Sequence, residues 1–136
     1  MSRINEKIEE IEGYLTELEE FIPLNFEEYK NNLEKRRFCE REAEIIIEAL
    51  VDLAFLVIKE KKLKSPETDD EAFAILNKEN IITLGLSNKL KEAKGMRNII
   101  AHEYGRVEDL LLFKALSNQI MPDSEEFIKS IRLSLK

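Results

Sequence analysis

Residues 4–22, INEKIEEIEGYLTELEEFI, carry an apolar side chain at every third or fourth position. The spacing alternates between four and three residues at Ile4, Ile8, Ile11, Leu15, Leu18 and Ile22. Such a period places the apolar residues on one face of an α-helix. Most of the other residues are Glu, which is typical of the solvated face of an amphipathic helix. The stretch therefore predicts a helix that buries one apolar stripe.

The same spacing continues beyond Pro23 and Asn25, which predict the end of the first helix and the start of the next. We expect one long helix over about residues 26–63. Its apolar stripe comprises Phe26, Tyr29, Leu33, Ala43, Ile47, Leu50, Ala54 and Val57. Stripes on two long helices could also serve self-association, so we expect a two-fold dimer.

Two positions of the second stripe are polar, Arg36 and Glu40. Their spacing allows an i,i+4 ion pair at the edge of the core. They could equally form the wall of a polar cavity or a contact between two copies of the chain. Cys39, which lies beside them, is expected to be a small buried residue rather than a reactive thiolate.

The remaining chain predicts four further helices, over about residues 70–78, 84–100, 107–120 and 124–135. Thr68 or Asp69 would cap the first of these, and Pro122 with Ser124 would mark the start of the last. The chain of 136 residues holds only 4 Gly and 3 Pro, few for a protein with many β-turns. We expect one all-α domain, residues 1–136, built as an antiparallel bundle of five or six helices.

The composition excludes several classes of site. One cysteine excludes an internal disulfide framework and a cysteine metal cluster, and one histidine excludes a multi-histidine site within the chain. We therefore expect neither a bound metal nor a cofactor. No apolar run approaches the roughly 20 residues of a membrane span, and no signal peptide is recognisable at the N-terminus. A cytoplasmic protein without a membrane partner is the expectation.

Chemistry-bearing residues gather in residues 95–105, GMRNIIAHEYG. The stretch contains His102, the one histidine of the chain, with Arg97 five residues before it and Tyr104 two residues after it. Asn98 follows the arginine. The segment just before it is locally basic, because residues 89–97 hold four cationic residues and one acid in a chain of net charge −7. This local positive charge is a modest indication that a polyanion such as a nucleic acid binds nearby.

Arginine and histidine together suffice for cleaving RNA without a metal. Histidine, with a reference pKa near 6.5, can accept or donate a proton at neutral pH. A guanidinium can stabilise the negative charge that gathers on phosphate oxygens in the transition state. One histidine cannot act as acid and base at once. A two-fold dimer with the motif at its axis would supply two histidines and two arginines.

On an uninterrupted helix, Arg97 and His102 would lie roughly 140° apart. Either the helix ends or bends within the motif, which Gly105 favours, or the two groups flank a groove that a partner completes. A purely structural interpretation also stands, in which Arg97 and His102 cap carbonyls or pair with Glu103 and Glu108.

The stretch RNIIAHEY, residues 97–104, resembles the R-x4-H-x-Y motif of HepT-like toxins, a branch of the HEPN (higher eukaryotes and prokaryotes nucleotide-binding) superfamily. The similarity covers most of the chain. Residues 41–54, REAEIIIEALVDLA, resemble the long second helix of the family. The regions 70–76 and 95–98 and the final apolar helices follow in the family's order.

The resemblance implies an all-helical dimer that acts as a metal-independent endoribonuclease, the toxin of a type II toxin–antitoxin pair. Arg97 and His102 would be catalytic, with Asn98 in support. A minimal nucleotidyltransferase antitoxin would silence the toxin by attaching AMP to Tyr104.

Three further points belong to the resemblance. Arg41 and Asp52 match recurrent family positions, and we assign them no role beyond a place in the cleft. Some HEPN proteins are non-catalytic dimers that bind a nucleotide or a nucleotidyltransferase partner, which is the alternative function. A separate, purely structural alternative for Tyr104 is that it only packs its ring at a helix end.

Overall fold

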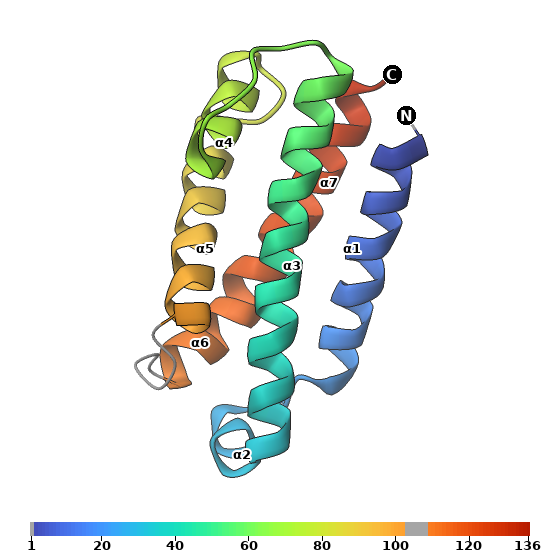
Figure 1. Cartoon of the computed structure of the whole chain (residues 1–136). Helices are drawn as coiled ribbons and strands as arrows, with labels where there is room; N and C mark the ends of the chain where they lie inside the picture. Colours follow the sequence, from blue (N-terminus) through green and yellow to red (C-terminus); the bar gives the residue numbers. More distant parts are fainter. Residues whose placement is uncertain (1, 103–108) are drawn as a thin grey trace.

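The computed structural model describes residues 2–102 and 109–136, apart from the side chains of Ser2 and of residues 98–102. All regular elements in these ranges are helical: α1 (Ser2–Phe21), α2 (Phe26–Asn31), α3 (Leu33–Glu60), α4 (Asp69–Lys78), α5 (Leu84–His102), α6 (Asp109–Ala115), the π-helical turn η1 (Leu116–Ile120) and α7 (Met121–Ser134). Because α6, η1 and α7 follow one another directly, the described residues form six helical rods. Figure 1 shows the long rods running up and down the bundle. The predicted all-α bundle is confirmed.

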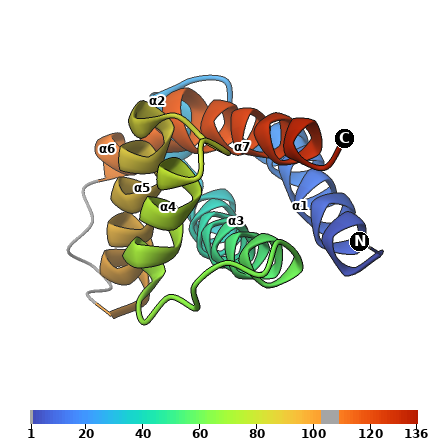
Figure 2. The same cartoon turned by 90° about the horizontal axis from the view of Figure 1, so that it is seen from above.

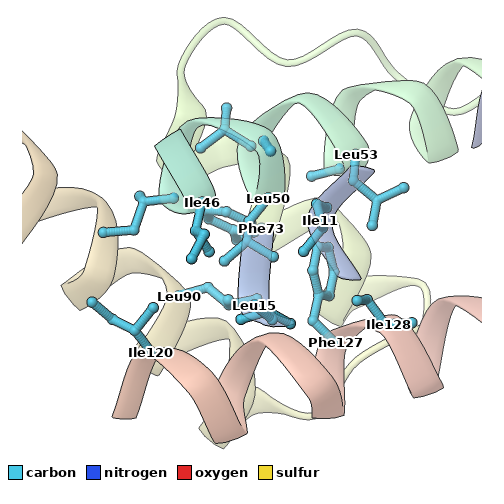
Figure 3. Packing of buried hydrophobic residues seen from close by; sticks show 14 of the residues in the cluster. Ile11, Leu15, Ile46, Leu50, Leu53, Phe73, Leu90, Ile120, Phe127 and Ile128 are labelled. Carbon is cyan, nitrogen blue, oxygen red and sulfur yellow. The ribbon is translucent and has the colours of Figure 1, made fainter. Parts of the chain in front are cut away.

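The stripe on α1 packs against α3 within one chain. Ile4, Ile8, Ile11, Leu15 and Leu18 are all buried, as are the stripe positions Ala43, Ile47, Leu50, Ala54 and Val57 of α3. Phe73 of α4, Leu90 of α5 and Phe127 of α7 complete the same core (Figure 3). Burial of a large aliphatic or aromatic side chain contributes about 1.5–3 kcal/mol. The core of one chain therefore buries most of both stripes, which leaves little of them, chiefly the half-exposed Leu33, for self-association.

The predicted long helix over residues 26–63 is in fact two helices, α2 and α3. Asn32, between them, is extended (φ −122°, ψ 97°), and its side chain accepts a hydrogen bond from the N–H of Lys35. Its own N–H donates to the carbonyl of Tyr29 and closes α2. Asparagine competes for backbone hydrogen bonds and is a favoured N-cap, so it ends one helix and begins the next.

Pro122 does not separate two helices as predicted. The rod continues from α6 into α7 through η1, where the N–H of Met121 donates to the carbonyl of Leu116, five residues earlier. Proline has no N–H and its ring crowds the preceding turn, and π-helical turns are a common way to accommodate such a defect. The Ser124 hydroxyl donates to the carbonyl of Ile120 at 2.6 Å.

Two smaller predictions are confirmed. Thr68 caps α4, since its hydroxyl accepts a hydrogen bond from the N–H of Glu71 at 3.1 Å. Cys39 is fully buried, and burial raises the pKa of its thiol to about 11, which leaves it unreactive. Across the described ranges, no helix combines the length and the apolar character that a bilayer crossing requires.

Candidate active site

Helix α5 carries the first part of the motif and does not end until His102. Arg97 and His102 are therefore both on helical backbone, about 7.5 Å apart along the axis and roughly 140° apart around it. The possibility that the helix ends between them is excluded. Asn98 and His102, four residues apart, occupy the same face. On straight helical backbone, the two positions face different sides of α5 and would flank a groove rather than share one shallow pocket.

Arg97 is the motif residue whose side chain the structure describes. It is partly buried, and its Nε is buried with no hydrogen-bond partner in the described part of the chain. Buried donors are nearly always satisfied, so an unpaired one calls for an explanation. This Nε is closed to solvent, so Arg97 would meet a phosphate oxygen through the rest of its guanidinium or after a movement of its side chain.

The other motif predictions rest on residues that the structure does not describe. The side chains of Asn98 and His102 lie outside the described residues, and so does the whole of Tyr104. The same holds for Glu103 and Glu108, the acids of the purely structural interpretation. The roles of these residues stay predictions.

Arg36 does not pair with Glu40, contrary to the predicted i,i+4 ion pair. Its Nη1 donates instead to Oδ2 of Asp109 at 2.9 Å, which links α3 to the first residue of α6. Burial raises the pKa of the Glu40 carboxyl, and the neighbouring charge of Asp109 raises it further. The contact fixes the start of the rod that follows the motif. Sequence reasoning missed Asp109, although an acid a few residues after the motif was a signal.

Arg41 and Asp52 both lie on the exposed surface of α3. Arg41 forms an ion pair with Glu44 at 3.5 Å, and Asp52 forms one with Lys7 of α1 at 3.7 Å. They are 11 residues apart, which is about 16 Å along the helix. Neither forms a hydrogen bond or ion pair with Arg97 within the described ranges, so the structure does not bring these candidates together.

The basic segment before the motif is partly neutralised. Lys89 lies 4.0 Å from Asp123 of α7, and Lys94 lies 4.0 Å from Asp70 of α4. Both pairs connect α5 to neighbouring helices. The local positive charge that the sequence shows is therefore smaller on the folded surface, and it is a weaker footprint for a polyanion than expected.

Two grooves on the described surface lie away from Arg97. One, of about 570 Å³, runs between α1 and α7 and includes Glu12, Glu125 and Arg132. The other, of about 650 Å³, lies between the start of α1, the second half of α3 and the loop after it. Among the described residues, no group of three or more His, Cys, Asp or Glu side chains could hold a metal ion.

Comparison with protein families adds to this geometry. The model of the family described as Ribonuclease HepT-like matches residues 11–131, nearly the whole chain. The chain belongs to the HepT-like ribonuclease family. The matched range contains α3, α5 and the complete R-x4-H-x-Y motif, as the resemblance predicted.

Individual relatives of this HepT-like chain agree with the family match. It is 29% identical over 114 residues to the tRNA nuclease HepT of Aphanizomenon flos-aquae, covering 84% of this chain and 78% of the relative. It is 31% identical over 85 residues to the mRNA nuclease HepT of Shewanella oneidensis, covering 62% and 63%. A solved structure of the tri-AMPylated Shewanella oneidensis HEPN toxin in complex with MNT antitoxin superimposes with a TM-score of 0.87 at 24% identity, covering 96% of both chains. That likeness shows the HEPN fold.

Proposed function

We propose that this HepT-like protein is the toxin of a type II toxin–antitoxin pair, a metal-independent endoribonuclease that acts in the cytoplasm as a homodimer. The observation that carries the proposal is the family match over residues 11–131, which contains the complete R-x4-H-x-Y motif with Arg97 and His102. Relatives named tRNA nuclease and mRNA nuclease support RNA as the substrate class.

The proposed reaction needs only the substrate and the motif. The ribose 2′-hydroxyl attacks the adjacent phosphorus, a new P–O2′ bond forms, and the P–O5′ bond breaks to leave a 2′,3′-cyclic phosphate. One His102 accepts the proton of the 2′-hydroxyl, and a second histidine donates a proton to the leaving 5′-oxygen. Arg97 stabilises the negative charge on the non-bridging oxygens, with Asn98 in support.

The homodimer follows from this proton balance. One chain supplies one histidine, and the reaction uses an acid and a base at the same time. The helical geometry of α5 points the same way, because Arg97 and His102 diverge by roughly 140° and can flank a groove between two copies. A two-fold axis near the C-terminal end of α5 would bring both motifs together.

The proposed regulation acts at Tyr104. The phenol oxygen attacks the α-phosphorus of ATP in the active site of a minimal nucleotidyltransferase antitoxin, pyrophosphate leaves, and a base of that enzyme takes the phenol proton. The AMP phosphate then pairs with Arg97 and occupies the place of the scissile phosphate. The solved relative that is tri-AMPylated and bound to an MNT antitoxin supports this partner.

Expression in cells tests the toxin function. The wild-type chain should arrest growth, and co-expression of its nucleotidyltransferase partner should restore it. Arg97→Ala should remove the arrest without the partner. Lys91→Ala, which removes a cation from the same helix, is the matched control and should remain toxic. Full toxicity of the Arg97→Ala protein at equal expression would refute the proposed site.

A further inference from the structure

The groove between α1 and α3, here called the N-terminal groove, is lined by more cationic side chains than carboxylates. Its rim holds Arg3 and Lys7 of α1 and Lys59 of α3, against one carboxylate, Asp52. Arg3 and Lys59 are exposed, whereas Lys7 is held at 3.7 Å from Asp52 and 3.2 Å from Glu10. In a chain of net charge −7, such a concentration of cations marks a place where an anion is attracted.

The floor of the N-terminal groove is apolar. Phe55 and Leu56 of α3 and Leu63 and Pro66 of the following loop line it, and none of them is fully buried. A groove that combines cationic side chains with an aromatic ring, here Phe55, suits single-stranded nucleic acid, since cations meet phosphates and a ring can stack on a base. The volume of about 650 Å³ is within the usual range of ligand pockets.

The turn that ends α3 contains a further exposed cation, Lys62. Its φ is 56°, in the left-handed region, and the N–H of Leu63 donates to the carbonyl of Ile58 as in a Schellman cap. Glycine is usual at such a position, because a side chain there is strained. Here a lysine takes it, exposed and next to the groove residue Leu63. Asn80 has the same conformation at the end of α4, so the positive φ marks a helix cap, and the case for Lys62 rests on its exposed charge beside the groove.

Lys62 belongs to a basic run, residues 59–64, KEKKLK. Part of the run has structural roles, since Lys61 donates to the carbonyl of Ser134 at 2.8 Å and Lys64 lies 3.8 Å from Glu71. Lys59 and Lys62 remain as exposed cations at the end of α3 that borders the groove. Figure 2 looks onto this end of the bundle, where α1 begins and the loop to α4 leaves α3.

We propose that the N-terminal groove, with Lys59 and Lys62 at its edge, is a second binding site for the RNA substrate, which takes phosphates on the lysines and a base on Phe55. The inference rests on the proposed ribonuclease function and adds a place where RNA binds away from the scissile bond. Such a second site would favour long RNA substrates over short ones.

The position of the groove explains this selection. Helix α5 runs antiparallel to α3, so the C-terminal end of α5 and the N-terminal groove lie toward opposite ends of the bundle (Figure 1). The 19 residues of α5 span about 28 Å. At the roughly 3.4 Å per nucleotide of a stacked strand, an RNA of about eight nucleotides spans the length of α5.

RNA binding tests the proposal. A His102→Ala background prevents cleavage, and a labelled RNA of about 20 nucleotides is titrated against the protein at several salt concentrations. Lys59→Glu and Lys62→Gly should each weaken binding about 3–10-fold and reduce the slope of log K against log salt by about 0.7–0.9 per lost contact. Lys78→Glu, an exposed lysine of α4 outside the groove, is the matched control.

Lys62→Gly separates binding from folding. Glycine relieves the left-handed backbone, so the midpoint of thermal unfolding should rise while RNA affinity falls. In the protein that keeps His102, Lys59→Glu and Lys62→Gly should each raise the KM for a long RNA and leave the cleavage of a trinucleotide unchanged.

The outcomes separate the proposals. If the wild type cleaves RNA and the variants bind and cleave long RNA like the wild type, the groove is not an RNA site. If they lose only binding of the antitoxin, it is a protein surface. Absence of cleavage by the wild type refutes the proposed function instead.

Discussion

Arg36 of α3 donates a hydrogen bond to Asp109 of α6 across 73 positions of sequence, and the two side chains lie 2.9 Å apart. The side chains are 25% and 35% exposed, so both charges are partly withdrawn from water. The pair attaches the rod that follows the motif to the central helix of the bundle. Since α5 also packs on α3, the chain on both sides of residues 103–108 is anchored to the same helix.

Breaking this pair should destabilise the fold measurably. Arg36→Ala leaves the Asp109 carboxylate partly buried and unpaired, and should lower the free energy of unfolding by about 1–3 kcal/mol. The exposed neighbour Arg37→Ala should change it by less than about 0.5 kcal/mol. The double exchange Arg36→Asp with Asp109→Arg restores an ion pair and should recover part of the lost free energy of unfolding. Recovery should be incomplete, because an arginine in the first turn of α6 interacts unfavourably with the helix dipole. Urea denaturation measures all of these, and strict additivity of the two single exchanges would contradict a direct pair.

Glu42 should make stability depend on pH. It is 6% exposed, with Oε2 unpartnered in the described structure, and burial raises the pKa of its carboxyl from an ordinary value of 4.5 to about 7, with Glu17 adding to the effect. The folded state therefore binds more protons than the unfolded state between about pH 4.5 and pH 7. The Glu42 contribution to stability is present at low pH and is lost as the pH rises through that window.

Glu42→Gln should remove this dependence and raise the free energy of unfolding at pH 8 by about 1 kcal/mol, because it removes an unpaired buried charge. The exposed Glu48→Gln on the same helix serves as the control and should leave the pH profile unchanged. Denaturation curves at pH 5 and pH 8 decide the matter. An unaltered pH profile in Glu42→Gln would show that another group carries the effect.

Tyr104→Phe should separate cleavage from silencing. Phenylalanine keeps the ring but lacks the oxygen that would receive AMP, so the variant should cleave RNA at close to the wild-type rate and escape its antitoxin. Tyr14→Phe, a change of a tyrosine on α1, should remain subject to silencing. Intact mass after co-expression reports the number of AMP groups. Continued addition of AMP to Tyr104→Phe would place the switch at another residue.

Mixed dimers test whether the site needs two histidines. Wild-type and His102→Ala chains are mixed at varied ratios under conditions of subunit exchange, at constant total protein. If acid and base come from different chains, activity should fall as the square of the wild-type fraction, because a hybrid has only one histidine. Light scattering should give twice the chain mass of 15.9 kDa. A monomer, or a linear loss of activity, would exclude the composite site.

Where the fold follows a local period, the sequence is a sufficient guide. The alternating spacing of Ile4, Ile8 and Ile11 predicts α1, and Thr68 predicts the start of α4, because amphipathicity and capping act within a few residues. The sequence does not reveal the break at Asn32, because the apolar period continues through it. The break arises because the Asn32 side chain accepts a hydrogen bond from the backbone N–H of Lys35. The sequence also does not reveal that the helical rod continues through Pro122, because the π-helical turn that accommodates the proline has no recognisable sequence pattern.

The candidate site divides in the same way. The motif from Arg97 to Tyr104 is contiguous and can be recognised from the chain itself. The partner of Arg36 cannot, because Asp109 reaches it only through the folded bundle. Lys94 and Asp70 also lie on different helices, and their pairing reduces the local positive charge that composition alone suggests. The stripes on α1 and α3 also show that an apolar face alone does not reveal whether its partner is the same chain or another copy.

Cleavage of RNA by the purified wild type and by His102→Ala, both in excess chelator, tests the proposed ribonuclease site most directly. Equal circular dichroism and equal mass in solution ensure that the two proteins differ only in the imidazole. We predict that the wild type cleaves without added metal and that His102→Ala is slower by a factor on the order of 10²–10⁴, the usual contribution of general acid–base catalysis. Cleavage by His102→Ala at the wild-type rate, or loss of wild-type cleavage in chelator, would contradict a metal-independent ribonuclease at this motif.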